Sequence, residues 1–238
     1  MKKVNKNYFI NFKSPIEISN PETSSKLIEI KELILREFIE PEKGNKIMKV
    51  MMDSLNSEEF HYFFPSLNYS SEANKAVLNL EKFNKRFLSN KYRHSYLIYA
   101  NSLILNNEIM KYEKLIGIVS IDNVKFYNKN CFVSIFISNE FRHYGIATLA
   151  IKFIKNRVFN DGLFDGGSYK IMHKIKTYIN IDNVNAIKTF KKAGFYKVGI
   201  YTDEEFRDNG YCDMVSMECL NGKKPKIRNL INKFKTIF

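Results

Sequence analysis

The sequence predicts a mixed α/β or α+β fold, in which helices pack on a central sheet. Three observations support this prediction. The expected elements follow in the order helices, several consecutive strands, then strand–helix–strand–helix–strand–strand. The length of 238 residues suits one elaborated domain or two small ones. Apolar residues make up 45% of the chain and aromatic residues 14%, which favours a packed core over global disorder.

The N-terminal half begins with residues 8–12, which alternate and predict a strand. Residues 24–39 indicate a helix, because Ser and Thr stand at the start and apolar residues recur at helical spacing. A short helix is expected over residues 48–55, and Pro65 interrupts the aromatic segment that follows. Residues 70–91 predict a further helix that Ser71 can cap, with an apolar stripe of Ala76, Leu80, Phe83 and Phe87.

The C-terminal half alternates strands and helices. The polar "NNE" separates the first two strands, a glycine-rich loop "NDGLFDGGS" follows the first helix, and Gly194 ends the second helix. We expect strands over residues 95–100, 114–121, 131–137, 174–181, 195–201 and 211–220, helices over 144–159 and 182–194, and a turn over 203–210.

The formal charge of +13 fits a nucleic-acid, membrane-surface or acidic-ligand partner. It equally fits a general compositional bias, since Lys, Asn and Ile are abundant throughout. Three cysteines, with no CxxC and no Cys/His cluster, predict neither a disulfide framework nor a metal site, and they indicate a reducing cytoplasm. The sequence shows neither a signal peptide nor a continuous apolar run of about 18 residues, so we expect a cytoplasmic protein.

The segment "ISNEFRHYGIATLAIKFIKN" places a strand, a turn and a helix in succession. The first N–H groups of a helix lack internal partners and carry the positive end of its dipole, so such a turn can hold a diphosphate. Gly145 allows close approach, Ala147 keeps the next position small, and Arg142 adds charge. Neither a P-loop nor a GxGxxG pattern is present. The same pattern also fits a plain turn, and we expect alanine to be tolerated at position 145 as in a helix's first turn.

A second segment, "NVNAIKTFKKAGF", follows about 35 residues later along the chain. With "RHYGIA" it resembles the GCN5-related N-acetyltransferase superfamily, whose first motif is Arg or Gln, two residues, Gly, one residue, then Gly or Ala. The second motif of that family begins with Asn and ends in Gly-Phe, here Asn183 and Gly194-Phe195. The ending "GFYKVGIYTDEEFRDNGYCDMVSMECL" looks like the branch that acetylates ribosomal-protein N-termini. The resemblance covers residues 114–220.

This resemblance implies a mostly antiparallel sheet with a V-shaped split between residues 131–137 and 174–181. It implies a single domain over residues 1–220, followed by a basic amphipathic tail over 221–238, and acetyl-CoA as co-substrate with no metal. Backbone N–H groups of residues 143–147 would meet the pyrophosphate, residues 135–137 would pair with the pantetheine arm, and the second helix would contact the cofactor. The implied cofactor-binding residues are Ile135, Phe136, Ile137, Arg142, His143, Tyr144, Gly145, Ile146, Ala147, Asn183 and Phe190.

The chain also departs from the family pattern. His143 and Tyr144 stand where a glycine and a lysine are usual. Phe190 replaces a tyrosine that protonates the leaving thiolate, and Phe132 replaces a glutamate. The acid and the base are therefore unassigned, and Ser134 and Asn183 are the candidate catalytic residues. The alternative for Ser134 is a strand serine bonded to its own backbone.

The predicted function is acetyl-CoA-dependent N-acetylation of a primary amine. The acceptor is a protein N-terminus, a small amine or an amine carried on an acidic molecule, and Tyr201 and Tyr211 are candidates to line its pocket. The alternative is an acetyltransferase-like binding module, without catalysis, for nucleic acid or a membrane surface. The tail either lies on a membrane interface or packs on its own domain or on a second subunit, which would make a homodimer.

Overall fold

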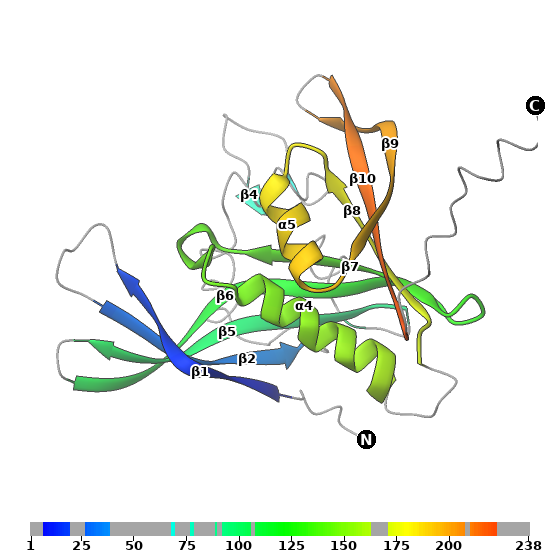
Figure 1. Ribbon diagram of the computed structural model, residues 1–238. Coiled ribbons are helices and arrows are strands. Elements are labelled where there is room, and N and C mark those ends of the chain that lie inside the picture. Colours follow the sequence, from blue (N-terminus) through cyan, green and yellow to red (C-terminus); the bar gives the residue numbers. More distant parts are fainter. Residues whose placement is uncertain are drawn as a thin grey trace, which may run out of the picture.

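The computed structural model describes residues 7–19, 27–38, 68–69, 77–78, 89, 92–105, 108–162, 171–207 and 210–222. Within them, eight strands form one sheet in the order β1-β2-β5-β6-β7-β8-β10-β9 (Figure 1). The strands are β1 (Asn7–Ser19), β2 (Leu27–Glu37), β5 (His94–Leu105), β6 (Glu108–Lys125), β7 (Asn130–Ile137), β8 (Lys174–Asn180), β9 (Tyr196–Arg207) and β10 (Gly210–Leu220).

Two helices lie on one face of this sheet, α4 (Ile146–Asn156) and α5 (Val184–Lys192), and Figure 1 shows both in front of the strands. A π-helical turn, η3 (Arg157–Asp161), continues α4. The helices cover the strand face that carries Val133, Ile175 and Val215, all at most 2% exposed. Helix α4 contributes to this core the four buried residues that recur at helical spacing, Ile146, Ala150, Ile151 and Ile154.

Only β7 and β8 are parallel among these strands, and their pairing is short. The ladder joins Asn130–Phe132 to Lys174–Lys176 and ends there, although both strands continue. Beyond that point β7 stays paired with β6, while β8 stays paired with β10 and turns away (Figure 1). The prediction of a mostly antiparallel sheet with a V-shaped split is therefore confirmed.

The helix predicted over residues 24–39 is wrong, because residues 27–37 form strand β2 between β1 and β5. Leu33, Ile34 and Leu35 are consecutive and each at most 6% exposed, so both faces of this strand are buried. A strand buried on both faces has a nearly continuous apolar run, which also fits the helical spacing of apolar residues. Its position between β1 and β5 inside the sheet makes this segment a strand rather than a helix.

Two further predictions need correction. Val77–Leu78, inside the predicted helix 70–91, form strand β4, which pairs with β3 (Asn68–Tyr69). The β-branched Val77 suits this extended pairing. The predicted turn over 203–210 is shorter, because β9 continues to Arg207 against β10. Asp213 explains this: its Oδ1 accepts a hydrogen bond from the Asp203 amide at 3.0 Å, where Asp203 has φ 51°, so a bulge replaces the turn.

The strands predicted over residues 8–12, 95–100, 114–121, 131–137, 174–181, 195–201 and 211–220 are confirmed as parts of longer or matching strands. The predicted helix 48–55, most of 70–91, residues 163–168 of the predicted glycine-rich loop 160–168 and residues 223–238 of the tail lie outside the described residues. The first two residues of that loop, Asn160 and Asp161, belong to η3 instead. The boundaries of the single domain remain a prediction. None of the helices in the described part of the chain is long and apolar enough to cross a membrane.

Candidate active site

The turn after β7 is firmly held by the sheet. The Ser138 amide donates to the Ile116 carbonyl at 2.8 Å, and the short 3₁₀ turn η2 (Asn139–Phe141) follows. Phe141 is 2% exposed in the core and Lys114 lies 5.0 Å above its ring. These contacts fix the point from which the chain enters the predicted phosphate loop.

The predicted phosphate loop has a strained backbone and an uncapped helix start. His143 has φ 69° and Gly145 has φ 80°, both in the left-handed region. Gly145 is the last residue before α4 rather than part of its first turn, so alanine there would add about 1–2 kcal/mol of backbone strain instead of being neutral. No side chain caps α4, and its first turn has no acidic residue. Its first N–H groups are thus available to an anion, and His143, Tyr144 and Gly145 are exposed beside them.

Arg142 connects this loop to the end of β7. Its Nε donates to the Ile137 carbonyl at 2.8 Å, and its guanidinium carbon lies 5.4 Å from the centre of the Phe136 ring. The side chain is half-buried. Arg142 therefore shapes the loop as well as adding charge to it.

The predicted pantetheine segment, residues 135–137, lies on the β7 edge that faces the split. From Phe132 to Ile137 this edge runs about 16 Å, at about 3.3 Å per residue, beyond the last pair with β8. Phe136 and Ile137 have buried side chains, and Ile135 is half-buried. A ligand in the split would therefore meet the backbone N–H and C=O groups of this edge rather than its side chains. Gly117 of β6 permits the arrangement, because a Cβ there would collide with the Phe136 carbonyl oxygen.

Helix α5 follows β8 after a short turn, and α4 follows β7 after η2 and the predicted phosphate loop. Since β7 and β8 are parallel, both helix N-termini lie at the same edge of the split. Asn183 caps α5, with Oδ1 accepting from the Ala186 amide at 3.0 Å. Phe190 is 3% exposed and its ring centre lies 5.0 Å from that of Phe195, so it is a core residue of α5.

Ser134 lies on the sheet face opposite α4 and α5, because Cys131 and Val133 of β7 point into the helix-covered core. Its Oγ donates to Asp122 Oδ2 at 3.3 Å, rather than to its own backbone. Asp122 is 8% exposed and accepts from Arg93 Nε at 2.6 Å. The candidate catalytic serine is thus oriented by a carboxylate that forms a partly buried ion pair with Arg93.

Three aromatic rings, from β7, β8 and β9, lie in a row on the same sheet face as Ser134. The ring centres of Phe132 and Tyr178 are 5.1 Å apart, and those of Tyr178 and Tyr201 are 5.3 Å apart. Burial raises the pKa of Tyr178, and a hydrogen bond with Tyr201 and the nearby carboxylates of Glu204 and Glu218 raise it further. Tyr201, predicted as a pocket residue, belongs to this row, whereas Tyr211 contacts Phe206 near the end of the β9–β10 ribbon.

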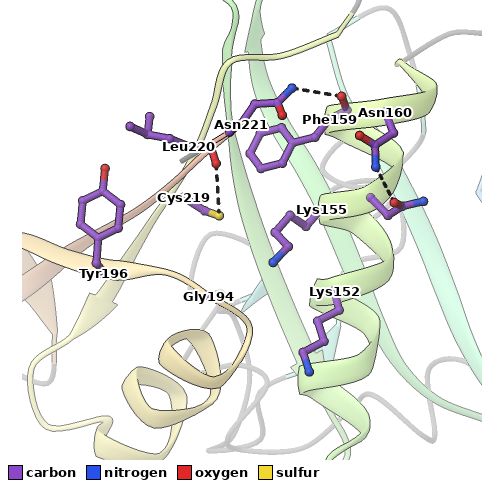
Figure 2. Close-up of a pocket in the computed structure, with 11 residues that line it drawn as sticks. Lys152, Lys155, Phe159, Asn160, Gly194, Tyr196, Cys219, Leu220 and Asn221 are labelled. Atoms are coloured by element: carbon purple, nitrogen blue, oxygen red, sulfur yellow. Dashed lines mark hydrogen bonds between the residues drawn. The ribbon is translucent and has the colours of Figure 1, made fainter. Parts of the chain in front are cut away.

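A separate pocket of about 590 Å³ lies at the other end of α4 (Figure 2). No residue of the predicted phosphate loop lines it. Figure 2 shows Lys155 pointing from α4 toward the Gly194 turn, where its Nζ donates to the Ala193 carbonyl at 2.8 Å. Asn221 Nδ2 donates to the Phe159 carbonyl at 3.1 Å. These polar groups hold α4, α5 and the end of β10 together. No group of three or more metal-ligating side chains gathers anywhere in the described ranges.

Solved structures share this arrangement. The spermidine N-acetyltransferase of Vibrio cholerae, solved in complex with CoA and spermine, matches with a TM-score of 0.57 over 79% of this chain and 95% of its own, at 18% identity. The chain has a GCN5-related N-acetyltransferase fold. A chimeric form of the same Vibrio cholerae enzyme matches with a TM-score of 0.53 over 79% of this chain and 95% of that one, at 17% identity. No protein-family model and no curated protein sequence matches the chain.

Sequence reasoning missed three residues beside the split. Tyr178 was detectable, because in "KIKTYIN" Ile175 and Ile179 fall on one face of a strand and Tyr178 falls on the other. Asp122 and Gly117 gave no such indication. Their roles depend on the register of β6 against β7, which the sequence does not show.

Proposed function

We propose that the protein is an acetyl-CoA-dependent N-acetyltransferase whose acceptor is a primary amine. The observation that carries this proposal is the edge of the split where both helices begin. An uncapped helix start with two left-handed residues before it suits a diphosphate. The β7 edge beside it can pair with an extended amide-containing arm, as coenzyme A has.

In this proposal the cofactor groups divide along the site. The N–H groups of residues 143–147 bind the pyrophosphate, and Arg142 adds charge while holding the loop. The backbone of residues 135–137 pairs with the arm, and Asn183 places the start of α5 beside it. Phe190 acts by packing, because it is only 3% exposed.

The reaction then needs a neutral amine at the acetyl carbonyl. The amine attacks the thioester carbon, the C–N bond forms and the C–S bond breaks. Binding both reactants beside the split lowers the entropic part of the barrier. Because only the unprotonated amine attacks, the rate rises with pH until the bound amine is neutral.

The acceptor follows from opposing charge effects. The formal charge of +13 repels polycations in general, which favours an amine with one charge or one carried on an acidic molecule. Locally, Glu204 and Glu218 lie near Tyr178, although Lys174 pairs with Glu218 at 2.9 Å. The segment from Gly194 to Leu220 resembles the branch that acetylates ribosomal-protein N-termini, which supports a protein N-terminus as the acceptor. We therefore propose a singly charged amine, such as a peptide N-terminus, in place of the spermine bound by the Vibrio cholerae enzyme.

The test has two stages. Calorimetric titration with acetyl-CoA at fixed salt should show binding at one site per chain. Coenzyme A release is then measured with peptides bearing free N-termini, an aminosugar, an aminoacyl-tRNA and spermine. We expect the peptides, the aminosugar or the aminoacyl-tRNA to give higher kcat/KM than spermine. A preference for spermine would contradict the proposed singly charged acceptor. An absence of acetyl-CoA binding would contradict the proposed acetyltransferase activity itself.

A further inference from the structure

The outer side of the two-helix layer is strongly basic. Residues 145–160, which include α4, and residues 183–202, which include α5, contain no acidic residue. Their exposed lysines are Lys152, Lys188, Lys191, Lys192 and Lys197. Three of them, at positions 188, 191 and 192, are spaced i, i+3 and i+4 and so share one face of α5. Because acidic residues resume at Asp203 on β9, this is a local concentration of charge rather than a bias spread evenly through the chain.

The lysines gather around the pocket of about 590 Å³ at the far end of α4. Lys152 lines this pocket from α4, while Gly194 and Tyr196 line it from the other side (Figure 2). Residues 191–197 lead from α5 into β9 and carry the other lysines of this group, Lys191, Lys192 and Lys197. Two helices and a strand therefore bring four exposed lysines to one hollow.

These four ammonium groups are available to a partner. The fifth lysine here, Lys155, donates to the Ala193 carbonyl at 2.8 Å, so its charge offsets the negative end of α5. The neighbouring carboxylates are already paired, Asp161 with Arg157 at 3.1 Å and Glu218 with Lys174 at 2.9 Å. In the part of the chain that the structure describes, no carboxylate pairs with the four exposed lysines. The surface therefore fits an anionic partner.

The pocket itself suits a flat group with a polar edge. Phe159 and Tyr196 contribute aromatic rings to its lining, and Asn156 and Asn160 contribute amides. Asn160 Nδ2 donates to Asn156 Oδ1 at 2.6 Å, which leaves the Asn156 N–H groups and the Asn160 carbonyl oxygen to bind a ligand. Val184 is the only exposed large apolar side chain on either helix, so this surface has little to insert into a lipid bilayer.

We propose that this surface binds a single-stranded segment of nucleic acid, with phosphates on Lys152, Lys191, Lys192 and Lys197 and one base in the pocket. Phosphate contacts supply affinity, and an unstacked base can meet an aromatic ring and amide groups. The site goes beyond the proposed acetylation, because no residue of the predicted phosphate loop lines the pocket. The nucleic acid and acetyl-CoA therefore bind toward opposite ends of α4.

The test measures binding of labelled single strands of about 12 uridines or thymidines by fluorescence anisotropy between 50 and 200 mM KCl. Each single-strand phosphate contact contributes about −0.7 to the slope of log K against log salt, so four contacts give about −2.8 and a loss of affinity of about 50-fold over this range. Lys152→Gln/Lys192→Gln should bring the slope to about −1.4. The matched control is Lys31→Gln/Lys176→Gln, which removes the same charge from β2 and β8 and should keep the parent's slope.

The base in the pocket gives a second readout. Tyr196→Ala removes a stacking ring and should weaken binding by about 5- to 150-fold without changing the salt slope, with Tm measured to show that the variant is folded. A duplex of the same length should bind more weakly than the single strand, because its bases are stacked inside the helix. Acetyl-CoA affinity should be the same in the parent and in every variant. Tighter binding of uridines than of thymidines would identify the partner as RNA, and the reverse would identify it as DNA.

Four results would overturn the inference. Equal slopes in the two double variants would show only a general effect of net charge. A duplex that binds as tightly as the single strand would exclude a base from the pocket. Tighter binding to vesicles that contain phosphatidylserine would make the partner a membrane. A loss of acetyl-CoA affinity in Lys152→Gln/Lys192→Gln would assign these lysines to the cofactor. If the parent binds the single strand but no acetyl-CoA, the proposed function fails and this inference stands.

Discussion

Substitution of Gly145 by glutamate tests whether the start of α4 binds a diphosphate. A Cβ at this position meets no atom within 4 Å, so the new side chain has room. Its carboxylate would lie at the positive end of the α4 dipole, which stabilises negative charge. The same N–H groups are those that the pyrophosphate needs. The variant should therefore fold and bind acetyl-CoA poorly.

The size of the effect has a binding part and a folding part. Each lost or opposed phosphate contact costs about 1–3 kcal/mol. At about 1.4 kcal/mol per decade, affinity for acetyl-CoA falls by about tenfold to a few hundredfold. Because Gly145 has φ 80°, any side chain there also adds about 1–2 kcal/mol of backbone strain. For a chain of this size that strain lowers Tm by about 2–8 °C.

The assay is calorimetric titration with acetyl-CoA at fixed salt, with Tm measured for each protein. Gly145→Ala carries the strain without the charge and should bind nearly as well as the parent. Gly222→Glu is a matched control, because Gly222 has φ 100° and open space around its Cβ but lies at the end of β10. It should lower Tm and leave binding unchanged. If folded Gly145→Glu binds like the parent, the loop is only a turn.

Three further predictions concern neighbouring residues. His143→Gly relieves the strain of a left-handed residue and should raise the free energy of unfolding in urea by about 1 kcal/mol. An unchanged urea midpoint would show that contacts of the imidazole offset this strain. Asn183→Ala should lower stability by about 1 kcal/mol through loss of the α5 cap, and Asn183→Asp should not, as urea unfolding of both can show. Burial raises the pKa of Cys131 to about 12, so iodoacetamide at pH 8 should modify half-exposed Cys212 before Cys131. Mass spectrometry measures the order of labelling, and early labelling of Cys131 would contradict its burial.

The same buried thiol gives stability a pH dependence. Its pKa is about 12 in the folded protein and about 8.5 in the unfolded chain, so the folded state holds the proton more tightly. The unfolded chain loses that proton first as pH rises. The free energy of unfolding should therefore be independent of this thiol's ionisation below about pH 8 and should fall progressively as pH rises toward 12. Urea midpoints from pH 7 to 11 measure this, and Cys131→Ala should reduce the slope.

The sequence predicted most of the C-terminal half, because local patterns decide it. Strand "CFVSIFI", the helix behind "RHYGIA" and the helix capped by Asn183 each combine an apolar pattern with a turn or cap. The N-terminal prediction failed at residues 27–37, where consecutive apolar residues fit both a helix face and a strand buried on both sides. Only pairing with β1 and β5 decides that case, and pairing partners far apart in sequence leave no local pattern.

The candidate site divides in the same way. Residues 142–147 and Asn183 were found because a helix start has a sequence pattern. The hydrogen bond between Ser134 and Asp122 was not found, because it depends on the register of β6 against β7. The contact of Tyr178 with Phe132 was not found either, because it depends on where the β7–β8 ladder ends. Nothing in "CFVSIFI" or "KIKTYIN" says that pairing stops after three residues.

His143 shows how the loop keeps its geometry although its sequence departs from the family pattern. A glycine is usual at this position, and the backbone retains φ 69°, which a glycine would adopt without cost. Histidine tolerates this region better than most residues, so the strain stays near the lower end of about 1–2 kcal/mol. Strain of this kind persists only where the surroundings over-determine the backbone. Here Phe141 is anchored in the core on one side and α4 on the other, which leaves residues 142–145 one path between them. The chain therefore needs the left-handed turn to place the α4 N-terminus at the end of β7, whichever residue occupies position 143.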